Sequence, residues 1–263
     1  MNPTQGWTLR DWLCWSEFFM SNEPSDWLCS PPIAPNTHAG ATSFWRWGRE
    51  TLAIWRKDML QEWRLRHGLM TSLLMGVVTV AALSFASLGV SLSVRLQAGV
   101  LWLAVLFGMF PALARGFISE EELGTADLLR LGARPSCVFW GKWLFHLTLY
   151  IVLSAVLVPL YMLMIAPLAG AWWAWLVLWG LGGVGLVTVL TLCGALVAGT
   201  ASRGALLAVV TFPLLLPMVL MLIAATEQIL QARPMWQSLQ GILGYGLTLS
   251  AGAAWIFEKI WRE

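Results

Sequence analysis

The chain has 263 residues, of which 58% are hydrophobic and only 11% are charged, and it contains 18 tryptophans. Soluble globular proteins are about 45 to 50% apolar, so this composition places the chain among membrane proteins. The formal net charge is only +2, and Lys and Arg form no continuous basic stripe. These two features exclude nucleic acid as a partner.

The first 43 residues differ in composition from the apolar part of the chain. They contain four prolines, Pro24, Pro31, Pro32 and Pro35, together with several Asn, Ser and Gly residues. They lack the order of basic, apolar and small residues that defines a signal peptide. We therefore expect residues 1–43 to form an N-terminal extension of low structure content.

Residues 44–67 are expected to form an amphipathic helix. Four large apolar residues recur at helical spacing: Leu52, Trp55, Met59 and Trp63. Polar and charged residues, including Lys57 and Asp58, occupy the opposite face. A cytosolic helix is one interpretation, but large apolar residues directly before a span favour a helix that lies in the membrane interface.

Residues 68–263 are expected to form an all-α membrane domain of six transmembrane helices. Windows of about 20 apolar residues are long enough to cross the hydrocarbon core of a bilayer. Each must be a helix, because lipid offers no partner to unpaired backbone groups. The six predicted spans are Leu69–Val94, Leu96–Ala114, Trp143–Ile165, Trp172–Gly199, Ala205–Ala225 and Leu239–Phe257.

The distribution of basic residues between the loops predicts the orientation of these spans. Of the 16 Lys and Arg residues, only Arg95 and Arg233 fall on one side, and the remainder fall on the other. Positive charges are retained on the cytoplasmic side of a membrane. We therefore expect both termini, and the acidic loop that begins at Phe117, to be cytoplasmic.

Sequence motifs for catalysis and metal binding are missing. The chain has no G-x-x-x-x-G-K-[ST] phosphate loop, no G-x-S-x-G and no H-E-x-x-H. Its four cysteines have no metal-binding or haem-attachment spacing. The sequence therefore predicts no catalytic residue, no metal site and no ATP hydrolysis by this chain.

His146 is the one ionisable residue that falls inside a predicted span. It lies near the start of the third span, close to Lys142. Its imidazole could bind a metal or haem, or it could form a hydrogen bond with a neighbouring residue. The sequence leaves both interpretations open and favours the hydrogen bond.

Two further features also have a functional and a structural interpretation. The segment AWWAW, residues 171–175, could cradle haem, but tryptophans at the start of a span are typical of an aromatic belt at the headgroup level. Pro213 and Pro217 lie four residues apart in the fifth span. Prolines at that spacing free backbone carbonyls and bend a helix, either as a hinge or as a static packing feature.

Several motifs resemble those of the haem exporter protein B family, a membrane component of the cytochrome c maturation system. The resemblance extends from about Trp55 to Ala225, and its specificity lies in the order and spacing of the motifs. They are IWRKDMLQEWRLRH at 54–67, F-x6-G-T-x-D-x-L at 117–129, Pro135, GKWLFH at 141–146 and SRGALLAVVTFPLLLP at 202–217.

The resemblance implies the fold of ABC-2 type permeases, with six spans, an interfacial N-terminal helix and a location in the bacterial inner membrane. It implies a role in haem delivery for cytochrome c maturation, with ATP hydrolysis in a separate ATP-binding subunit. Further implied partners are a haem-handling membrane subunit, a small membrane subunit, a periplasmic haem chaperone and a second copy of the chain. Haem is expected in the complex, without a residue of this chain assigned to bind it.

The resemblance also implies roles for particular residues. The loop between the second and third spans is expected to dock on the ATP-binding subunit through Glu120, Glu121, Glu122, Gly124, Asp127 and Arg130. Other positions that match the family motifs are Lys142, His146, Arg203, Gly204, Pro213 and Pro217. The alternative for the loop is a solvated connecting helix. The alternatives for the whole chain are an ABC-2 type permease for a lipid-linked sugar or a drug, and a membrane scaffold without transport activity.

Overall fold

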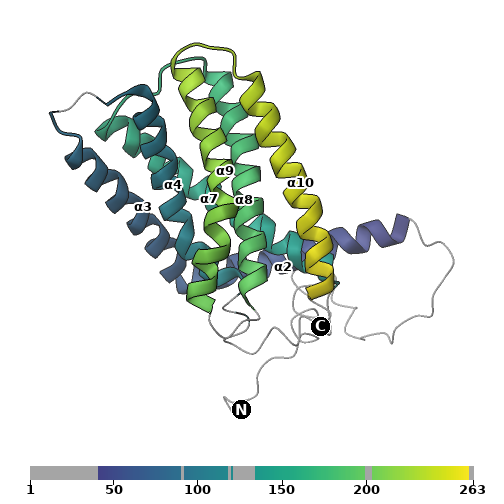
Figure 1. Cartoon of the computed structure of the whole chain (residues 1–263). Coiled ribbons are helices and arrows are strands. Elements are labelled where there is room, and N and C mark those ends of the chain that lie inside the picture. The colour runs from purple at the N-terminus through teal and green to yellow at the C-terminus, as the bar shows by residue number, and fades with distance from the viewer. Residues whose placement is uncertain (1–40, 90–91, 118–119, 121–133, 199–202, 261–263) are drawn as a thin grey trace, which may run out of the picture.

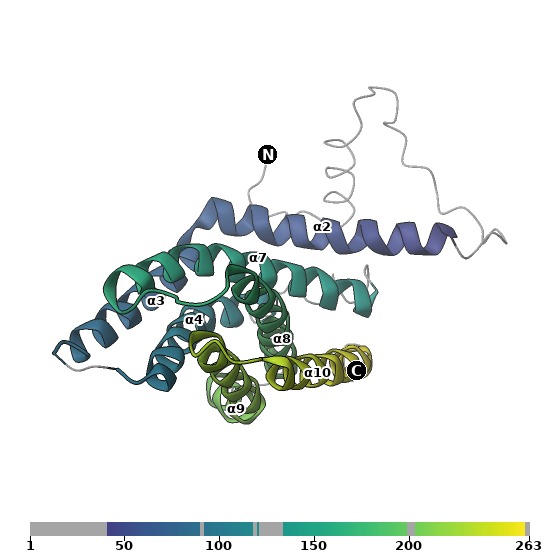
Figure 2. The ribbon, with the colours of Figure 1, turned by 90° about the horizontal axis from the view of Figure 1, so that it is seen from above.

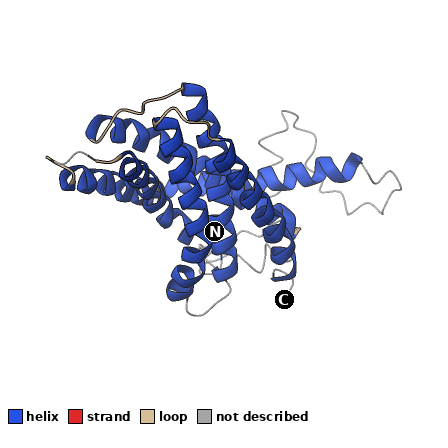
Figure 3. Ribbon diagram, turned by 45° about the horizontal axis from the view of Figure 1, so that its top comes forward, coloured by secondary structure: helices blue, strands red, loops and turns tan. Residues whose placement is uncertain are grey.

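The computed structural model describes residues 41–89, 92–117, 120, 134–198 and 203–260 of the chain. Within these residues every regular element is an α-helix (Figure 3). The seven helices in this part of the chain are α2 (Ala41–Leu65), α3 (His67–Ala86), α4 (Val94–Gly116), α7 (Pro135–Met164), α8 (Trp172–Ala198), α9 (Arg203–Leu230) and α10 (Trp236–Ile260). The predicted all-α fold is confirmed for the described residues.

Five of these helices, α3, α4, α7, α8 and α9, are long and apolar enough to cross a membrane. They run side by side in one bundle with α10, whereas α2 crosses the lower end of the bundle (Figure 1). The described helices thus divide into a transverse helix and a membrane bundle. The transverse helix α2 covers most of residues 44–67, for which the sequence predicts an amphipathic helix.

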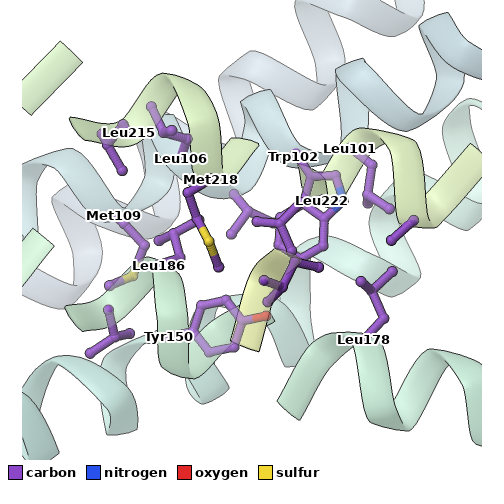
Figure 4. Packing of buried hydrophobic residues seen from close by; sticks show 14 of the residues in the cluster. Leu101, Trp102, Leu106, Met109, Tyr150, Leu178, Leu186, Leu215, Met218 and Leu222 are labelled. Carbon is purple, nitrogen blue, oxygen red and sulfur yellow. The ribbon is translucent and has the colours of Figure 1, made fainter. Parts of the chain in front are cut away.

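The most enclosed helix is α8, which packs against α4, α7, α9 and α10 (Figure 2). About 67% of its apolar window is buried, compared with 22% for α3 at the edge of the bundle. Side chains from α4, α7, α8 and α9 form the central core, in which Trp102, Tyr150, Leu186 and Met218 are buried (Figure 4). The core therefore lies along α8, and the outer faces of the surrounding helices remain apolar and exposed.

Tryptophan–threonine hydrogen bonds connect the helices inside this apolar bundle. The indole of Trp102 on α4 donates to Thr226 Oγ1 on α9 over 2.8 Å, and Trp143 on α7 donates to Thr188 Oγ1 on α8 over 3.0 Å. Each threonine hydroxyl in turn donates to the carbonyl four residues earlier in its own helix. Every polar group in these pairs thus has a partner where lipid provides none.

The structure corrects the boundaries of two predicted spans. The first was predicted to extend to Val94, but α3 ends at Ala86 and Val94 begins α4. Gly89 has a φ of 79°, which ends regular helix, and the Ser93 hydroxyl caps α4 by accepting from Leu96 N. A hydropathy average does not detect these two turn signals, because the residues around them are apolar.

The third span begins earlier than predicted. We expected it to start at Trp143, but α7 begins at Pro135, the first helical position. Proline is favoured there because the missing N–H would have no helical acceptor in any case. Lys142 lowers the local hydropathy and so conceals the first two turns of α7, which are the turns that carry the candidate site.

Candidate functional site

Four charged side chains meet where α2 crosses the start of α7: Lys57 and Asp58 from α2, Glu120 from the segment after α4, and Lys142 from α7. We refer to these four residues as the charge cluster. Lys142 Nζ lies 2.9 Å from Glu120 Oε1 and 3.3 Å from Asp58 Oδ2. Lys57 Nζ pairs with the same Glu120 oxygen and lies 3.4 Å from Asp58 Oδ1. Two cations and two anions therefore balance within one contact network.

Lys142 is the centre of the charge cluster and is only 1% exposed. Besides the two carboxylates, its ammonium donates to the carbonyl of Gly116, the last residue of α4, over 2.6 Å. A buried ammonium is costly unless it is paired and hydrogen-bonded. Lys142 meets this condition because Gly116 and Glu120 accept its hydrogen bonds and Asp58 adds an ion pair, so its burial ties α2, α4 and the segment of Glu120 to α7.

The two acids of the charge cluster are also buried. Asp58 is 6% and Glu120 is 5% exposed. Bulk water therefore does not solvate either carboxylate, and the lysines provide the opposite charge. Burial on its own lowers the pKa of Lys57, but the carboxylates of Asp58 and Glu120 outweigh burial and raise its pKa above the ordinary 10.5. Lys57 is therefore charged at neutral pH.

Close contact between α2 and α7 holds the cluster together. Gly141, next to Lys142, lies so near α2 that a Cβ added there would be 2.8 Å from Ile54 Cγ2 and 3.2 Å from the Thr51 carbonyl. A larger residue at this position would push the two helices apart. The glycine thereby allows Lys142 to reach Asp58.

His146 lies one turn further along α7 and is fully buried. Its Nδ1 is 3.0 Å from Thr191 Oγ1 on α8, and the Thr191 hydroxyl donates its only proton to the Val187 carbonyl. Nδ1 must therefore carry the proton and donate to Thr191. The Nε2 edge of the ring faces Gly116, where an added Cβ would lie 2.8 Å from Nε2. His146 thus bridges α7 to α8 and packs against the end of α4.

Glu120 is buried, whereas a residue that docks on another subunit needs to be exposed. The sequence assigns it to a loop that contacts another subunit, whereas the structure places its carboxylate inside the charge cluster. The other docking candidates, Glu121, Glu122, Gly124, Asp127 and Arg130, lie outside the described residues. The structure therefore locates one end of the loop and leaves its docking residues as a prediction.

The remaining family-motif positions lie on α9. Arg203 and Gly204 are its first two residues, and their side chains lie outside the described set. Pro213 and Pro217 lie within α9, which continues as one helix from Arg203 to Leu230. Pro213 and Pro217 are not among the described residues that form the ion pairs of the charge cluster.

One residue of the predicted polar face of α2 lies elsewhere than expected. Asp58 is buried against the bundle together with Thr51 and Ile54. The apolar residues Leu52 and Trp63 are 54% and 70% exposed. The physical reason is that Lys142 supplies a buried charge for Asp58, and no periodicity in α2 alone reveals that partner.

The tryptophan segment at 171–175 divides between surface and core. Trp172 and Trp173 are 75% and 53% exposed, as expected of an aromatic belt, but Trp175 is buried. Its indole donates to the Ala169 carbonyl over 3.1 Å. This segment therefore both presents rings outward and closes the core at the end of the bundle.

Comparison with protein families matches residues 49–257 to the family described as CcmB protein. The matched range covers most of α2, the whole charge cluster and nearly all of α10. Comparison with individually curated proteins gives no match. Because the family match covers more than half of an all-helical chain with five apolar helices of membrane-spanning length, the chain is an integral membrane protein that belongs to the CcmB family, the permease component of an ABC-type haem exporter for cytochrome c maturation.

Proposed function

We propose that this protein is the membrane subunit of an ATP-driven complex that delivers haem for cytochrome c maturation, and that ATP is bound and hydrolysed by a separate subunit. The observation that carries this proposal is the charge cluster, because it connects the segment of Glu120 to both α2 and α7. The family match supports the haem-exporter role of the complex. The charge cluster is the proposed connection through which a soluble ATPase acts on the membrane bundle.

The proposal includes a sixth span and the ABC-2 type permease fold. The sixth span is α10, whose 25 residues correspond to about 37 Å of helix, more than the roughly 30 Å of a hydrocarbon core. It packs against α7, α8 and α9 in the same bundle. Its polar residues, including Gln237 and Gln240, lower its hydropathy without shortening it.

The end of the bundle that α2 crosses is proposed to face the cytoplasm of a bacterial inner membrane. Arg95 lies at the start of α4 and Arg233 precedes α10, which is the opposite end of the bundle from α2 (Figure 1). These are the two basic residues that the sequence assigns to the outer side, and the positive-inside rule places the end rich in Lys and Arg in the cytoplasm. Both termini then belong to the cytoplasmic side.

We propose that the charge cluster transmits movement of the loop after Glu120 to α2 and α7. An ATPase subunit changes the conformation of a permease only if its contacts differ between nucleotide states. The loop after Glu120 provides the contact surface, and a displacement of this loop pulls on Lys57 and Lys142 through the Glu120 carboxylate. Since both lysines are held by Asp58 as well, α2 and the start of α7 move with the loop as one body. Glu120 is therefore a positioning residue, and Glu121, Glu122, Gly124, Asp127 and Arg130 are the proposed docking residues.

Two sets of variants separate docking from positioning. Glu121→Ala with Asp127→Ala should leave the membrane subunit stable but reduce its copurification with the ATP-binding subunit and its support of c-type cytochrome formation. Glu120→Gln should instead lower the stability of the membrane subunit, because it removes a buried charge partner. Normal copurification and normal cytochrome c formation with the double variant would contradict the docking role of this loop.

The remaining proposed partners follow from the family. They are a haem-handling membrane subunit, a small membrane subunit, a periplasmic haem chaperone and a second copy of this chain. Crosslinking of the assembled complex from membranes tests them. The proposal expects crosslinks to the ATP-binding subunit from residues 121–130 and none from residues 233–236 at the opposite end, and the reverse pattern would contradict the orientation.

A further inference from the structure

The carboxylates of α2 all point toward the protein. The helix contains three acidic residues. Glu50 accepts a hydrogen bond from Cys137 Sγ over 3.3 Å, Asp58 belongs to the charge cluster, and Glu62 accepts from Leu69 N at the start of α3. The negative charges of α2 are therefore used in internal contacts, and none remains to neutralise its outer side.

Three arginines of the same region are exposed at the surface. Arg49 and Arg64 on α2, and Arg66 in the turn before α3, are exposed. Among the residues that the structure describes, none of these three forms an ion pair. The outer surface of α2 thus carries an unbalanced positive charge.

Large apolar side chains lie beside these arginines. Leu52 is 54% and Trp63 is 70% exposed, and the Arg66 guanidinium lies 5.9 Å from the Trp63 ring centroid. At 100° per residue, Leu52 and Trp63 are only about 20° apart on the helix, and Arg49 lies about 60° from Leu52, whereas Arg64 lies about 120° from it. We call Arg49, Leu52, Trp63 and Arg66 the outer face of α2.

The contacts of α2 with α7 show which way the membrane lies. Trp55 Nε1 donates to Thr148 Oγ1 over 3.1 Å, and Met59 packs on Phe145 and Leu149. These α7 residues come after Lys142, deeper into the apolar part of α7. The side of α2 that carries Trp55 and Met59 therefore faces the bilayer, and Leu52 and Trp63 adjoin that side.

We propose that the outer face of α2 binds the anionic headgroups of phospholipids in the adjacent leaflet. Helices of this kind place apolar residues among the acyl chains while arginines reach the phosphates at the headgroup level. Each basic residue near an anionic leaflet strengthens the association by up to about fivefold. A bilayer fits this face better than an acidic protein, because a helix in the membrane interface places Leu52 and Trp63 among lipids and not in water. The binding requires only the membrane location and is independent of the ATPase partner.

The test uses the full-length protein reconstituted in phosphatidylcholine bilayers with either spin-labelled phosphatidylglycerol or spin-labelled phosphatidylcholine as the probe. The electron spin resonance spectrum gives the association of each probe with the protein. We expect phosphatidylglycerol to associate more strongly, and this preference to fall at high salt, which screens surface charge. The variant with Arg49→Gln and Arg66→Gln should lose the preference by about threefold or more, since each arginine contributes up to about fivefold.

Control variants keep the test decisive. Arg95→Gln with Arg233→Gln removes two arginines at the opposite end and should leave the preference within about 30% of the wild type. Replacing the two arginines of the outer face by Lys should retain most of it. A preference that survives the double Gln variant, or that does not change with salt in the wild type, overturns the proposal. Loss of the copurifying ATP-binding subunit with lipid preference intact would also overturn it, because the face would then bind a protein.

Discussion

Glu120→Gln and Lys142→Met each leave an uncompensated charge in the charge cluster. Breaking a buried ion pair by removing one partner costs about 3 to 5 kcal/mol. After Glu120→Gln, Asp58 still faces both lysines, and Lys142 still donates to the Gly116 carbonyl. We therefore expect a cost of about 3 kcal/mol in the free energy of unfolding, at the lower end of that range. After Lys142→Met, Lys57 is the one lysine of the charge cluster that remains for both carboxylates, and a similar cost is expected.

The double variant restores the charge balance. Lys57 and Asp58 remain as one pair, so the double variant should cost about 3 to 4 kcal/mol in place of the roughly 6 kcal/mol that the two single costs would give together. The favourable coupling between Glu120 and Lys142 is then about 2 to 3 kcal/mol. The assay is unfolding by sodium dodecyl sulfate titration of the purified protein in mixed micelles, with circular dichroism as the signal.

The pair of Arg95 and Glu227 provides the matched control. Its charged groups lie 3.3 Å apart, but the arginine side chain is 77% exposed, so its coupling should be below about 1 kcal/mol. A coupling between Glu120 and Lys142 as small as that of the control would refute the reasoning. So would a Glu120→Gln variant that unfolds at the wild-type detergent concentration.

Three further predictions concern stability. Gly116→Ala places a Cβ 2.8 Å from the His146 ring and should cost about 1 to 3 kcal/mol, while Gly180→Ala, with no heavy atom within 4 Å, should cost nothing in the same detergent titration. Trp102→Phe removes a buried indole donor and should cost about 2 kcal/mol, and an unchanged midpoint would count against the bond. The raised pKa of Lys57 means that its ion pairs stabilise the fold fully below pH 10.5 and that this contribution is lost as the pH rises beyond that value. The difference in unfolding free energy between the wild type and Lys57→Gln should accordingly shrink as the pH rises above 10.5, and a constant difference would contradict it.

Hydropathy predicted the helices well because the bilayer requires long apolar segments that satisfy their own backbone. It placed the end of the first span and the start of the third less well. Gly89, Ser93 and Pro135 mark these boundaries through backbone geometry and capping, and these effects are small beside the average hydropathy of 20 residues.

The charge cluster was beyond sequence reasoning for a different reason. Lys57 and Glu120 are 63 residues apart, and Glu120 and Lys142 are 22 residues apart. Each of these residues looks like an ordinary surface charge on its own segment. Only the crossing of α2 over α7 brings the charges together and buries them. The one local indication in the sequence was that Lys142 follows Gly141, a glycine at which two helices pack closely.

Deletion of the gene for this protein tests the central claim most directly, with haem staining of c-type cytochromes as the measurement and b-type cytochromes as the control. The account predicts that c-type cytochromes disappear while b-type cytochromes persist. It also predicts that the wild-type protein restores the c-type cytochromes only when its ATP-binding partner can hydrolyse ATP. Normal c-type cytochromes in the deletion strain, or full restoration with a partner that cannot hydrolyse ATP, would contradict the account.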